Sequence, residues 1–340
     1  MRIEYEEEFD AEEHTPIKIG LKSKSPKHEW SLLPSKAGGT PIWLNPIDLP
    51  SGGSCLCGIC ARPLQFLLQI NAPLSGDDES ESTYHRVLFV FMCTSMSCLL
   101  EDQVEQRKEK GSRSIKVFRC QGNNRFYSSV RDKPAAPLCS WCGTWRGDKV
   151  CSDSKRARYC SKIHQALHWI STQKTQCRMI HPSEDIPKAA SNDAWPEFEI
   201  TCVHESAFET QMPNASINVS ALRGDTEDER DAISWAYYTR RLYRHRAQVL
   251  RYSRDSTCEP LWVMSRGRPS RAAIPKCSSC GSDRAFEFQI MRRLLHLIKM
   301  ENDSTSLDWA TIVVYTCQAS CDGSRSYEEE FPWVQLMSYA

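Results

Sequence analysis

The chain has 340 residues, of which 40% are hydrophobic and 25% charged, and its 43 basic and 43 acidic side chains give a formal net charge of zero. This composition is ordinary for a soluble protein, and it excludes a chain-wide electrostatic attraction to nucleic acid or membranes. No run of 18 apolar residues occurs, and residues 1–16, which hold seven acidic side chains, predict a disordered acidic tail. We therefore expect an intracellular protein without a membrane span or a signal peptide.

Cysteine is frequent, with 17 residues in the chain. In a reducing compartment this number indicates metal ligands rather than disulfides. The odd count also leaves at least one thiol without a cysteine partner.

Residues 17–134 predict the first of two half-domains. A Pro-x-Trp-apolar element containing Trp43 comes first, and the pair Cys57 and Cys60 follows fourteen residues after that tryptophan. The charged segment 101–111 predicts an exposed helix or loop. Apolar runs predict strands at 64–70, 84–92 and 115–120. The second of these strands leads into Cys93 and Cys98, so it returns a second cysteine pair toward the first.

Residues 135–182 have a separate pattern of cysteine and histidine and predict a small zinc finger. We expect this finger to be an independent insert that the rest of the chain can lose without unfolding. The candidate ligands, in chain order, are Cys139, Cys142, Cys151, Cys160, His164 and Cys177.

Residues 183–228 are rich in Pro, Ser, Asn and acidic side chains and predict a linker with one short strand or docking segment at 195–200. Residues 229–254 predict a helix with a basic face. That face offers a contact for RNA, although a solvated helix face with balanced charges is the simpler interpretation. The arginines concerned are Arg240, Arg241, Arg244, Arg246 and Arg251.

Residues 229–340 predict the second half-domain, because they repeat the offsets of the first. Cys277 and Cys280 form one pair, Cys317 and Cys321 the other, and Trp262 precedes the first pair by fifteen residues. In both copies a phenylalanine follows the second cysteine by six positions, and Gln-Ile follows it by nine and ten. Chance does not readily produce so many matched offsets.

Two thiolates separated by two residues can coordinate one metal ion, and a second pair completes a tetrahedral shell of four thiolates. Structural zinc of this kind contributes about 10–16 kcal/mol of apparent binding energy to folding. Disulfides or buried apolar cysteines are the alternative interpretation. The predicted four-cysteine zinc sites are Cys57, Cys60, Cys93 and Cys98 in the first half and Cys277, Cys280, Cys317 and Cys321 in the second.

The finger resembles the MYND zinc finger, a protein-interaction module with two zinc ions. On that pattern Cys139, Cys142, Cys160 and His164 complete the first site, with His164 where the family usually has cysteine. The second site falls on Cys151, Ser154, Gln173 and Cys177. Serine and glutamine are poor zinc ligands, so we expect this second site to be lost or weak and about three zinc ions per chain. Candidate replacements are Asp153, His168 and His181.

The layout from Ile17 to Trp333 resembles the programmed cell death protein 2 family in its plant-like form. The most specific stretches are Pro34-Ser35-Lys36-Ala37-Gly38-Gly39, Leu56-Cys57-Gly58-Ile59-Cys60 and Phe286-Glu287-Phe288-Gln289-Ile290-Met291. The resemblance implies an α+β, mainly β fold in which two related zinc-bearing half-domains form one body around an inserted finger. It also implies a chaperone of one small-subunit ribosomal protein, ribosomal protein two. Such a chaperone would hold its client in the cytoplasm and shuttle it toward nuclear assembly of the 40S particle.

The residues themselves predict no enzyme. The chain has no P-loop, no nucleophile elbow and no H-E-x-x-H motif. Four protein ligands per ion would also leave no open position for metal catalysis. Two other functions stay open at this stage. One is a nuclear adaptor or transcriptional corepressor whose finger binds proline-rich peptides, and the other is an assembly factor that binds ribosomal RNA.

Overall fold

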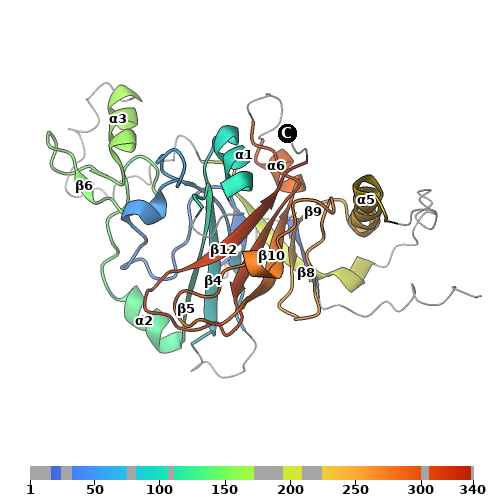
Figure 1. Cartoon of the computed structure of the whole chain (residues 1–340). Coiled ribbons are helices and arrows are strands. Elements are labelled where there is room, and N and C mark those ends of the chain that lie inside the picture. The colour runs from blue at the N-terminus through green and yellow to red at the C-terminus, as the bar shows by residue number, and fades with distance from the viewer. Residues whose placement is uncertain are drawn as a thin grey trace, which may run out of the picture.

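The computed structural model describes residues 17–23, 33–74, 82–105, 111–171, 194–208, 224–299 and 306–337. The acidic tail predicted at 1–16 lies outside these ranges. Ten strands of the described chain close into a barrel in the order β1-β8-β2-β3-β4-β5-β12-β11-β10-β9, and β9 pairs with β1 (Figure 1). The mainly β fold that we predicted is confirmed.

All neighbouring strands of the barrel run antiparallel. Strands from residues 17–134 and strands from the C-terminal segment lie in the same closed sheet. The barrel strands are β1 (Lys18–Lys22), β2 (Lys36–Ala37), β3 (Gln65–Asn71), β4 (His85–Met92), β5 (Ile115–Gly122), β8 (Phe198–His204), β9 (Gln248–Tyr252), β10 (Arg284–Met291), β11 (Thr311–Cys317) and β12 (Glu328–Gln335).

Helices and short turns lie around the barrel, with the finger and α5 on opposite sides of it (Figure 1). A separate two-stranded sheet, β6 (Lys149–Val150) and β7 (Arg158–Tyr159), belongs to the finger. The α-helices are α1 (Met96–Glu105), α2 (Asn124–Arg131), α3 (Lys162–Ser171), α5 (Glu227–Arg244) and α6 (Arg293–Leu297), and the 3-10 turns are η1 (Gly52–Cys55), η2 (Glu205–Phe208) and η4 (Arg271–Ala273).

The three strands predicted in residues 17–134 are confirmed as β3, β4 and β5, each within two residues of the predicted bounds. The charged segment predicted at 101–111 contributes to α1, which begins earlier, at Met96. The apolar segment predicted at 195–200 leads into β8. That strand pairs with β1 and β2, so part of the predicted linker belongs to the barrel wall.

The helix predicted at 229–254 was wrong at its C-terminal end. Helix α5 begins earlier, with a capping box in which Thr226 and Glu229 exchange hydrogen bonds, and it ends at Arg244. Residues 248–252 instead form β9, which pairs with both β1 and β10. These pairings come from distant segments, and they override the local helical pattern.

The two copies of the repeat make the same contacts at matched positions. The backbone N–H of Ile42 donates to Oε1 of Gln69 at 2.8 Å, and that of Leu261 donates to Oε1 of Gln289 at 2.6 Å. Each donor lies between the proline and the tryptophan of its Pro-x-Trp element. The register of β3 against β4 shifts between Phe66 and Leu68, and that of β10 against β11 shifts at the equivalent Phe286 and Phe288.

Side chains alternate between two faces along the barrel strands. On β4, Leu88 and Val90 belong to a cluster that contains residues from both halves of the chain and therefore fills the barrel interior. Phe89 and Phe91 belong to a second cluster on the outer face, packed around Trp43. The equivalent outer cluster of the second half surrounds Trp262. The two tryptophans are 9% and 8% exposed, so the repeat places them in similarly buried positions.

The finger packs against the barrel rather than standing apart from it. Trp145 is fully buried in the outer cluster of the first half, with its ring centroid 4.2 Å from that of Phe91. Its Nε1 donates to the carbonyl of Leu64 at 2.7 Å, and Nε1 of Trp43 donates to the carbonyl of Thr144 at 3.0 Å. The finger therefore completes the hydrophobic cover of the first half. That the rest of the chain can lose the finger without unfolding stays a prediction.

Candidate metal centres

Three groups of four side chains bring their potential ligand atoms together, all within 4.8 Å of one another in each group. They are Cys57, Cys60, Cys93 and Cys98; Cys139, Cys142, Cys160 and His164; and Cys277, Cys280, Cys317 and Cys321. The sequence grouped the same residues. Among the described residues no other group of this kind is present.

Each group begins with a knuckle of the same backbone shape. The residue after the second cysteine has a positive φ, which is 57° at Ala61, 60° at Gly143 and 74° at Gly281. In each knuckle that residue donates its N–H to the carbonyl of the first cysteine, at 2.8 to 3.0 Å. This turn points the two thiols of a C-x-x-C pair toward one point. Glycine adopts such a φ without strain, and Ala61 holds it at some conformational cost.

In the N-terminal centre, Cys57 and Cys60 come from the loop before β3, Cys93 follows β4, and Cys98 lies on α1. The Sγ atoms of Cys60 and Cys93 are 3.6 Å apart. Backbone hydrogen bonds from the same half fix the loop, because Gly58 N donates to Arg113 O and Cys93 N donates to Ser114 O, both at 2.8 Å. A hydrogen bond from the thiol of Cys93 lowers the pKa of Cys57 to about 5.

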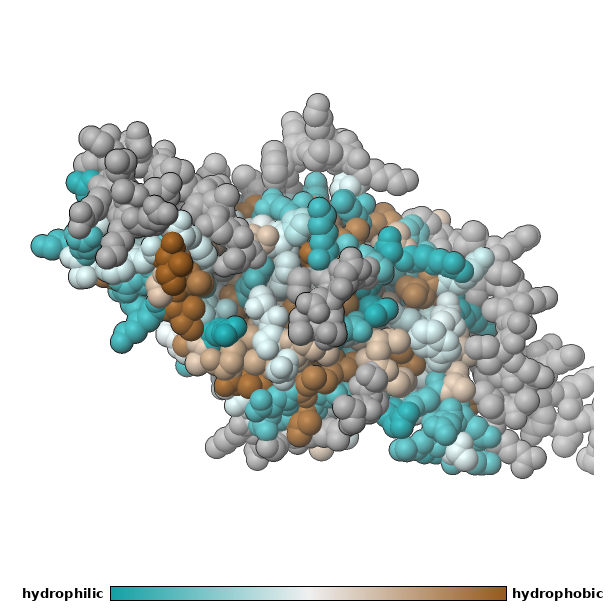
Figure 2. Space-filling view, turned by 90° about the horizontal axis from the view of Figure 1, so that it is seen from above, coloured by the Kyte–Doolittle hydropathy of each residue, from teal (hydrophilic) through white to brown (hydrophobic). Residues whose placement is uncertain are grey.

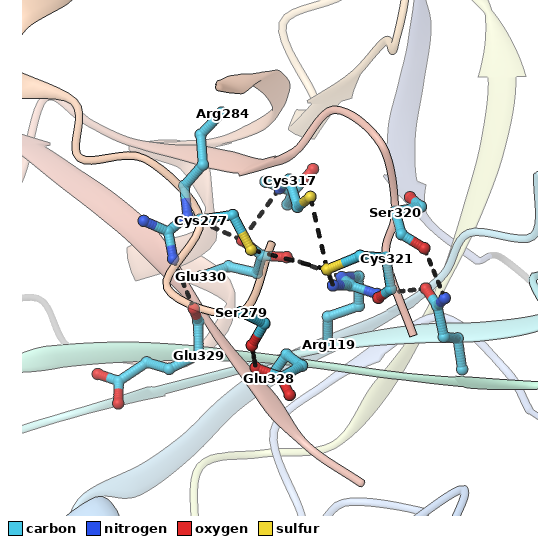
Figure 3. Close-up of polar contacts among 12 residues, drawn as sticks. Arg119, Cys277, Ser279, Arg284, Cys317, Ser320, Cys321, Glu328, Glu329 and Glu330 are labelled. Carbon is cyan, nitrogen blue, oxygen red and sulfur yellow. Dashed lines mark hydrogen bonds and ion pairs between the residues drawn. The ribbon is translucent and has the colours of Figure 1, made fainter. Parts of the chain in front are cut away.

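In the C-terminal centre, Cys277 and Cys280 precede β10, Cys317 ends β11, and Cys321 lies in the following loop. Figure 3 shows Cys277, Cys317 and Cys321 close together. The Sγ atoms of Cys277 and Cys321 are 3.7 Å apart, those of Cys280 and Cys317 are 3.6 Å apart, and those of Cys317 and Cys321 are 3.8 Å apart. Hydrogen bonding from Ser282 lowers the pKa of Cys280 to about 6.

In the finger centre, His164 lies in the first turn of α3 and its backbone N–H donates to Oγ of Ser161 at 3.1 Å. Its Nδ1 is 3.2 Å from Sγ of Cys160 and 3.7 Å from Sγ of Cys139. Hydrogen bonding from the thiol of Cys142 lowers the pKa of Cys139. One thiol in each centre is thus favoured in the thiolate form that a metal ion requires.

These arrangements fit a tetrahedral metal ion. With metal–sulfur bonds of about 2.3 Å, the sulfur atoms of a tetrahedral site lie about 3.8 Å apart. The distances of 3.6 to 3.8 Å in the C-terminal centre match that edge. Each centre supplies four protein ligands, which is the complete shell of a structural metal site.

The predicted second finger site has a different environment. Cys151 is fully buried and is not a member of the three ligand groups. It packs with Trp141 and Tyr159 in an apolar cluster that also contains Cys139 of the finger centre. The hydroxyl of Ser154 accepts the backbone N–H of Ala157 at 3.3 Å, and the ring of His168 hydrogen-bonds the Tyr159 hydroxyl at 2.9 Å. The other predicted ligands and replacements, Gln173, Cys177 and His181, lie outside the described residues. The expected loss or weakness of this second site stays a prediction.

The structure also shows polar residues around the C-terminal centre that sequence patterns did not single out. Buried Arg119, from β5, reaches Cys321, and buried Glu330, from β12, accepts the backbone N–H of Cys317 at 3.0 Å. No local pattern singled out either residue, because Glu330 follows two other glutamates on β12 and β5 also carries Lys116 and Gln121. Their partners could not be identified, because those partners lie far away in sequence.

The basic face predicted at the end of α5 is divided in the structure. Arg251 lies on β9, is 3% exposed, and forms a two-pronged ion pair with Glu205 at 2.6 and 3.0 Å. Arg241 also contacts Glu205, at 3.5 Å, whereas Arg240 and Arg246 are exposed. The surface that could contact RNA is therefore smaller than the sequence predicted. No helix among the described residues combines the length and apolar character needed to cross a lipid bilayer.

Comparisons with known proteins agree with this architecture. The family model for the N-terminal domain of programmed cell death protein 2 matches residues 16–134, and that for its C-terminal domain matches residues 232–336. Programmed cell death protein 2 of Rattus norvegicus is 33% identical, over 94% of this chain and 96% of the relative. Programmed cell death protein 2-like of Homo sapiens is 25% identical, over 90% and 91%.

A more distant relative is the "Probable 20S rRNA accumulation protein 4" of Schizosaccharomyces pombe, which is 22% identical over 84% of this chain and 87% of its own length. No solved structure gave a significant match. The matches of both halves and the near-complete coverage of relatives lead to one conclusion. The chain belongs to the programmed cell death protein 2 family.

Proposed function

We propose that the protein acts in ribosome biogenesis as a non-catalytic escort of one small-subunit ribosomal protein, ribosomal protein two. The observation that carries this proposal is similarity, over 84% of this chain, to a relative whose name refers to the accumulation of 20S rRNA. The family resemblance supplies the client and the route, from synthesis in the cytoplasm toward assembly of the 40S particle in the nucleus.

The architecture supports a binding role rather than a catalytic one. Each candidate centre has a full set of four protein ligands, and we propose that each holds one structural zinc ion. Such ions fix the knuckles and the strands that return to them, so they stabilise a rigid surface. A client that binds RNA is basic, and electrostatic complementarity on that surface would set its specificity and association rate.

A second candidate function rests on the exposed apolar face of α3. Ile163, Leu167 and Ile170 are 41%, 38% and 78% exposed, and none of the described residues of α3 is buried. Seen from above, hydrophobic residues gather at the end of the molecule where the finger lies (Figure 2). This face suits the nuclear adaptor that binds proline-rich peptides. The RNA-binding alternative is weakened, because Arg251 is buried in an ion pair.

Co-purification from cells tests the escort role. The tagged full-length protein should retain ribosomal protein two in stoichiometric amount, and retention should fall only modestly as salt rises. An RNA contact would instead weaken in proportion to the number of phosphates bound. Recovery of many proteins in small amounts, with no enrichment of this client, would contradict the escort.

Two matched surface variants separate the escort from the adaptor. The first replaces Ile163, Leu167 and Ile170 of α3 with serine. The control replaces Leu100 and Val104 of α1, which are 41% and 62% exposed, with serine. We expect both variants to retain the ribosomal client. Loss of the client from the α3 variant alone would place binding on the finger and favour the adaptor function.

A further inference from the structure

The C-terminal metal centre is supported from the other half of the chain. Arg119 lies on β5, in the N-terminal half, and reaches the loop that carries Cys321 (Figure 3). Gln121, on the same strand, reaches the same loop. Nη1 of Arg119 donates to the carbonyl of Cys321 at 2.9 Å, and Nη2 lies 3.9 Å from its Sγ. Nε2 of Gln121 donates to the carbonyl of Ser320 at 2.7 Å.

The guanidinium of Arg119 is held in place by a buried network. Its Nε donates to Oε1 of Glu330 at 2.7 Å, and both side chains are 1% exposed. The other carboxylate oxygen of Glu330 accepts from Nε of Arg284 and from the backbone N–H of Cys317, each at 3.0 Å. One carboxylate therefore joins Arg119 to a metal-ligating cysteine, and the arginine has little freedom to turn away.

The loop between the second cysteine pair needs such support. Ser320 has a φ of +43°, a strained value for a residue with a side chain. The backbone carbonyls of Ser320 and Cys321 are the two groups that Gln121 and Arg119 hold. At the N-terminal centre the equivalent backbone bonds are local, since Gly58 and Cys93 donate to Arg113 and Ser114 of the same half.

The strands that carry these groups also close the barrel. Only three residue pairs join β5 to β12 among the described residues, from Glu328 with Arg119 to Glu330 with Val117. Four thiolates around a divalent ion carry a net charge of −2, so a fixed guanidinium beside one sulfur stabilises the occupied centre. We call this short pairing of β5 with β12 the seam. The guanidinium of Arg119 spans the seam, because it lies on β5 and donates to Glu330 on β12.

We propose that Arg119 and Gln121 are outer partners of the C-terminal metal centre, so that metal binding there and closure of the β5–β12 seam favour each other. Because coupling between two equilibria is reciprocal, an occupied centre protects the seam and a closed seam retains the metal. This inference requires metal at the C-terminal centre. It does not depend on the client, because its test contains no client.

The test measures metal retention cysteine by cysteine in the full-length, metal-loaded protein. A chelator and a thiol-alkylating reagent are added together, and mass spectrometry of the peptides gives an alkylation rate for each cysteine. For Arg119→Gln we expect Cys317 and Cys321 to react about tenfold faster or more, since loss of an outer partner typically lowers metal affinity by about 10- to 100-fold. Cys57 and Cys60 should react at the wild-type rate.

Arg86→Gln is the matched control, because Arg86 is an equally buried arginine on the neighbouring strand whose partner Glu287 also comes from the second half. Arg86→Gln should not accelerate the alkylation of Cys317 and Cys321 relative to that of Cys57 and Cys60. Gln121→Ala, at a less buried position, should accelerate the alkylation of Cys317 and Cys321 to a smaller extent. This variant gives the decisive result if Arg119→Gln does not fold. If Cys317 and Cys321 keep their wild-type protection in folded Arg119→Gln, or in Gln121→Ala where Arg119→Gln does not fold, the proposal is overturned. It is also overturned if Arg86→Gln accelerates the alkylation of Cys317 and Cys321 relative to Cys57 and Cys60 as much as Arg119→Gln does.

Hydrogen exchange provides the reciprocal measurement. In Cys321→Ser, which removes one ligand, the amides of Val117 and Arg119 should exchange faster than in the wild type. The amides of β3 and β4 should keep their protection. Unchanged exchange along β5 would show that the metal and the seam are independent.

Discussion

Arg86 of β4 and Glu287 of β10 form a two-pronged ion pair inside the barrel, at 2.5 and 2.8 Å, and neither side chain is exposed to solvent. The two residues are 201 positions apart in the chain. Arg254 and Tyr252 also contact the carboxylate, at 3.1 Å each. This pair connects the two halves of the chain through their common interior.

Removing one partner of that pair should destabilise the whole barrel. Arg86→Met leaves the carboxylate of Glu287 buried with fewer partners, and breaking a buried pair in this way typically costs about 3–5 kcal/mol. The double variant Arg86→Met with Glu287→Met should recover part of the loss, since it leaves no buried charge uncompensated at this position. Chemical denaturation of the three proteins measures the difference. A single variant as stable as the wild type would contradict the expected role of the pair.

The same pair predicts a dependence of stability on acidity. Burial by itself raises the pKa of Glu287, but attraction by Arg86 outweighs it and leaves the pKa at about 2. Because the folded pKa lies below the ordinary value, the stabilisation is complete above about pH 4.5 and is lost as the pH falls toward 2. The difference in unfolding free energy between wild type and Glu287→Gln should therefore shrink over this window. A difference that stays constant would show that this carboxyl does not titrate with folding.

Elemental analysis of the purified protein should give close to three zinc ions per chain. The three groups of ligands are preassembled, whereas Cys151 belongs to none of them. A count of four or more would mean that other ligands rescue the second finger site. A count of two or fewer would remove at least one of the three assignments.

Trp145→Ala should lower the stability of the first half as well as that of the finger. Truncating a buried tryptophan typically costs about 3–5 kcal/mol, and this side chain fills the outer cluster around Phe91. The thermal unfolding midpoint of the full chain measures the effect. Trp235→Ala on α5 is the control, because Trp235 is 41% exposed and should change the midpoint little. An equal, small shift for both variants would instead support the finger as an independent insert.

Two cysteine variants should separate the barrel from the finger in client binding. Cys57→Ser removes one of four ligands of the N-terminal centre and with it most of the metal's contribution to folding, so it should abolish binding of ribosomal protein two. Cys151→Ser leaves all three ligand groups intact and should bind the client as the wild type does. Pull-down of newly made client measures both. Loss of the client by Cys151→Ser with retention by Cys57→Ser would move the binding site to the finger.

The sequence by itself determined the features that depend on short spacings. The offsets between Cys57 and Cys60, and between Cys277 and Cys280, identify the knuckles, because a tight turn fixes the two thiols whatever surrounds it. The apolar runs identify the strands that return the second pairs. Repeated offsets also show that Gln69 and Gln289 are equivalent, although they do not show that each holds the backbone beside a tryptophan.

Only the tertiary structure decided which distant residues meet. The sequence predicted Arg251 as part of a basic helix. In the structure Arg251 lies on β9, which pairs with β1 and β10, and its side chain binds Glu205. The sequence did not predict that Trp145 packs against the barrel, because the rings that surround it come from β4 and from the segment around Trp43. Arg119 and Glu330 are 211 positions apart, and they become partners only when the barrel closes. Such pairings depend on closure of the whole sheet, and no local pattern of residues encodes them.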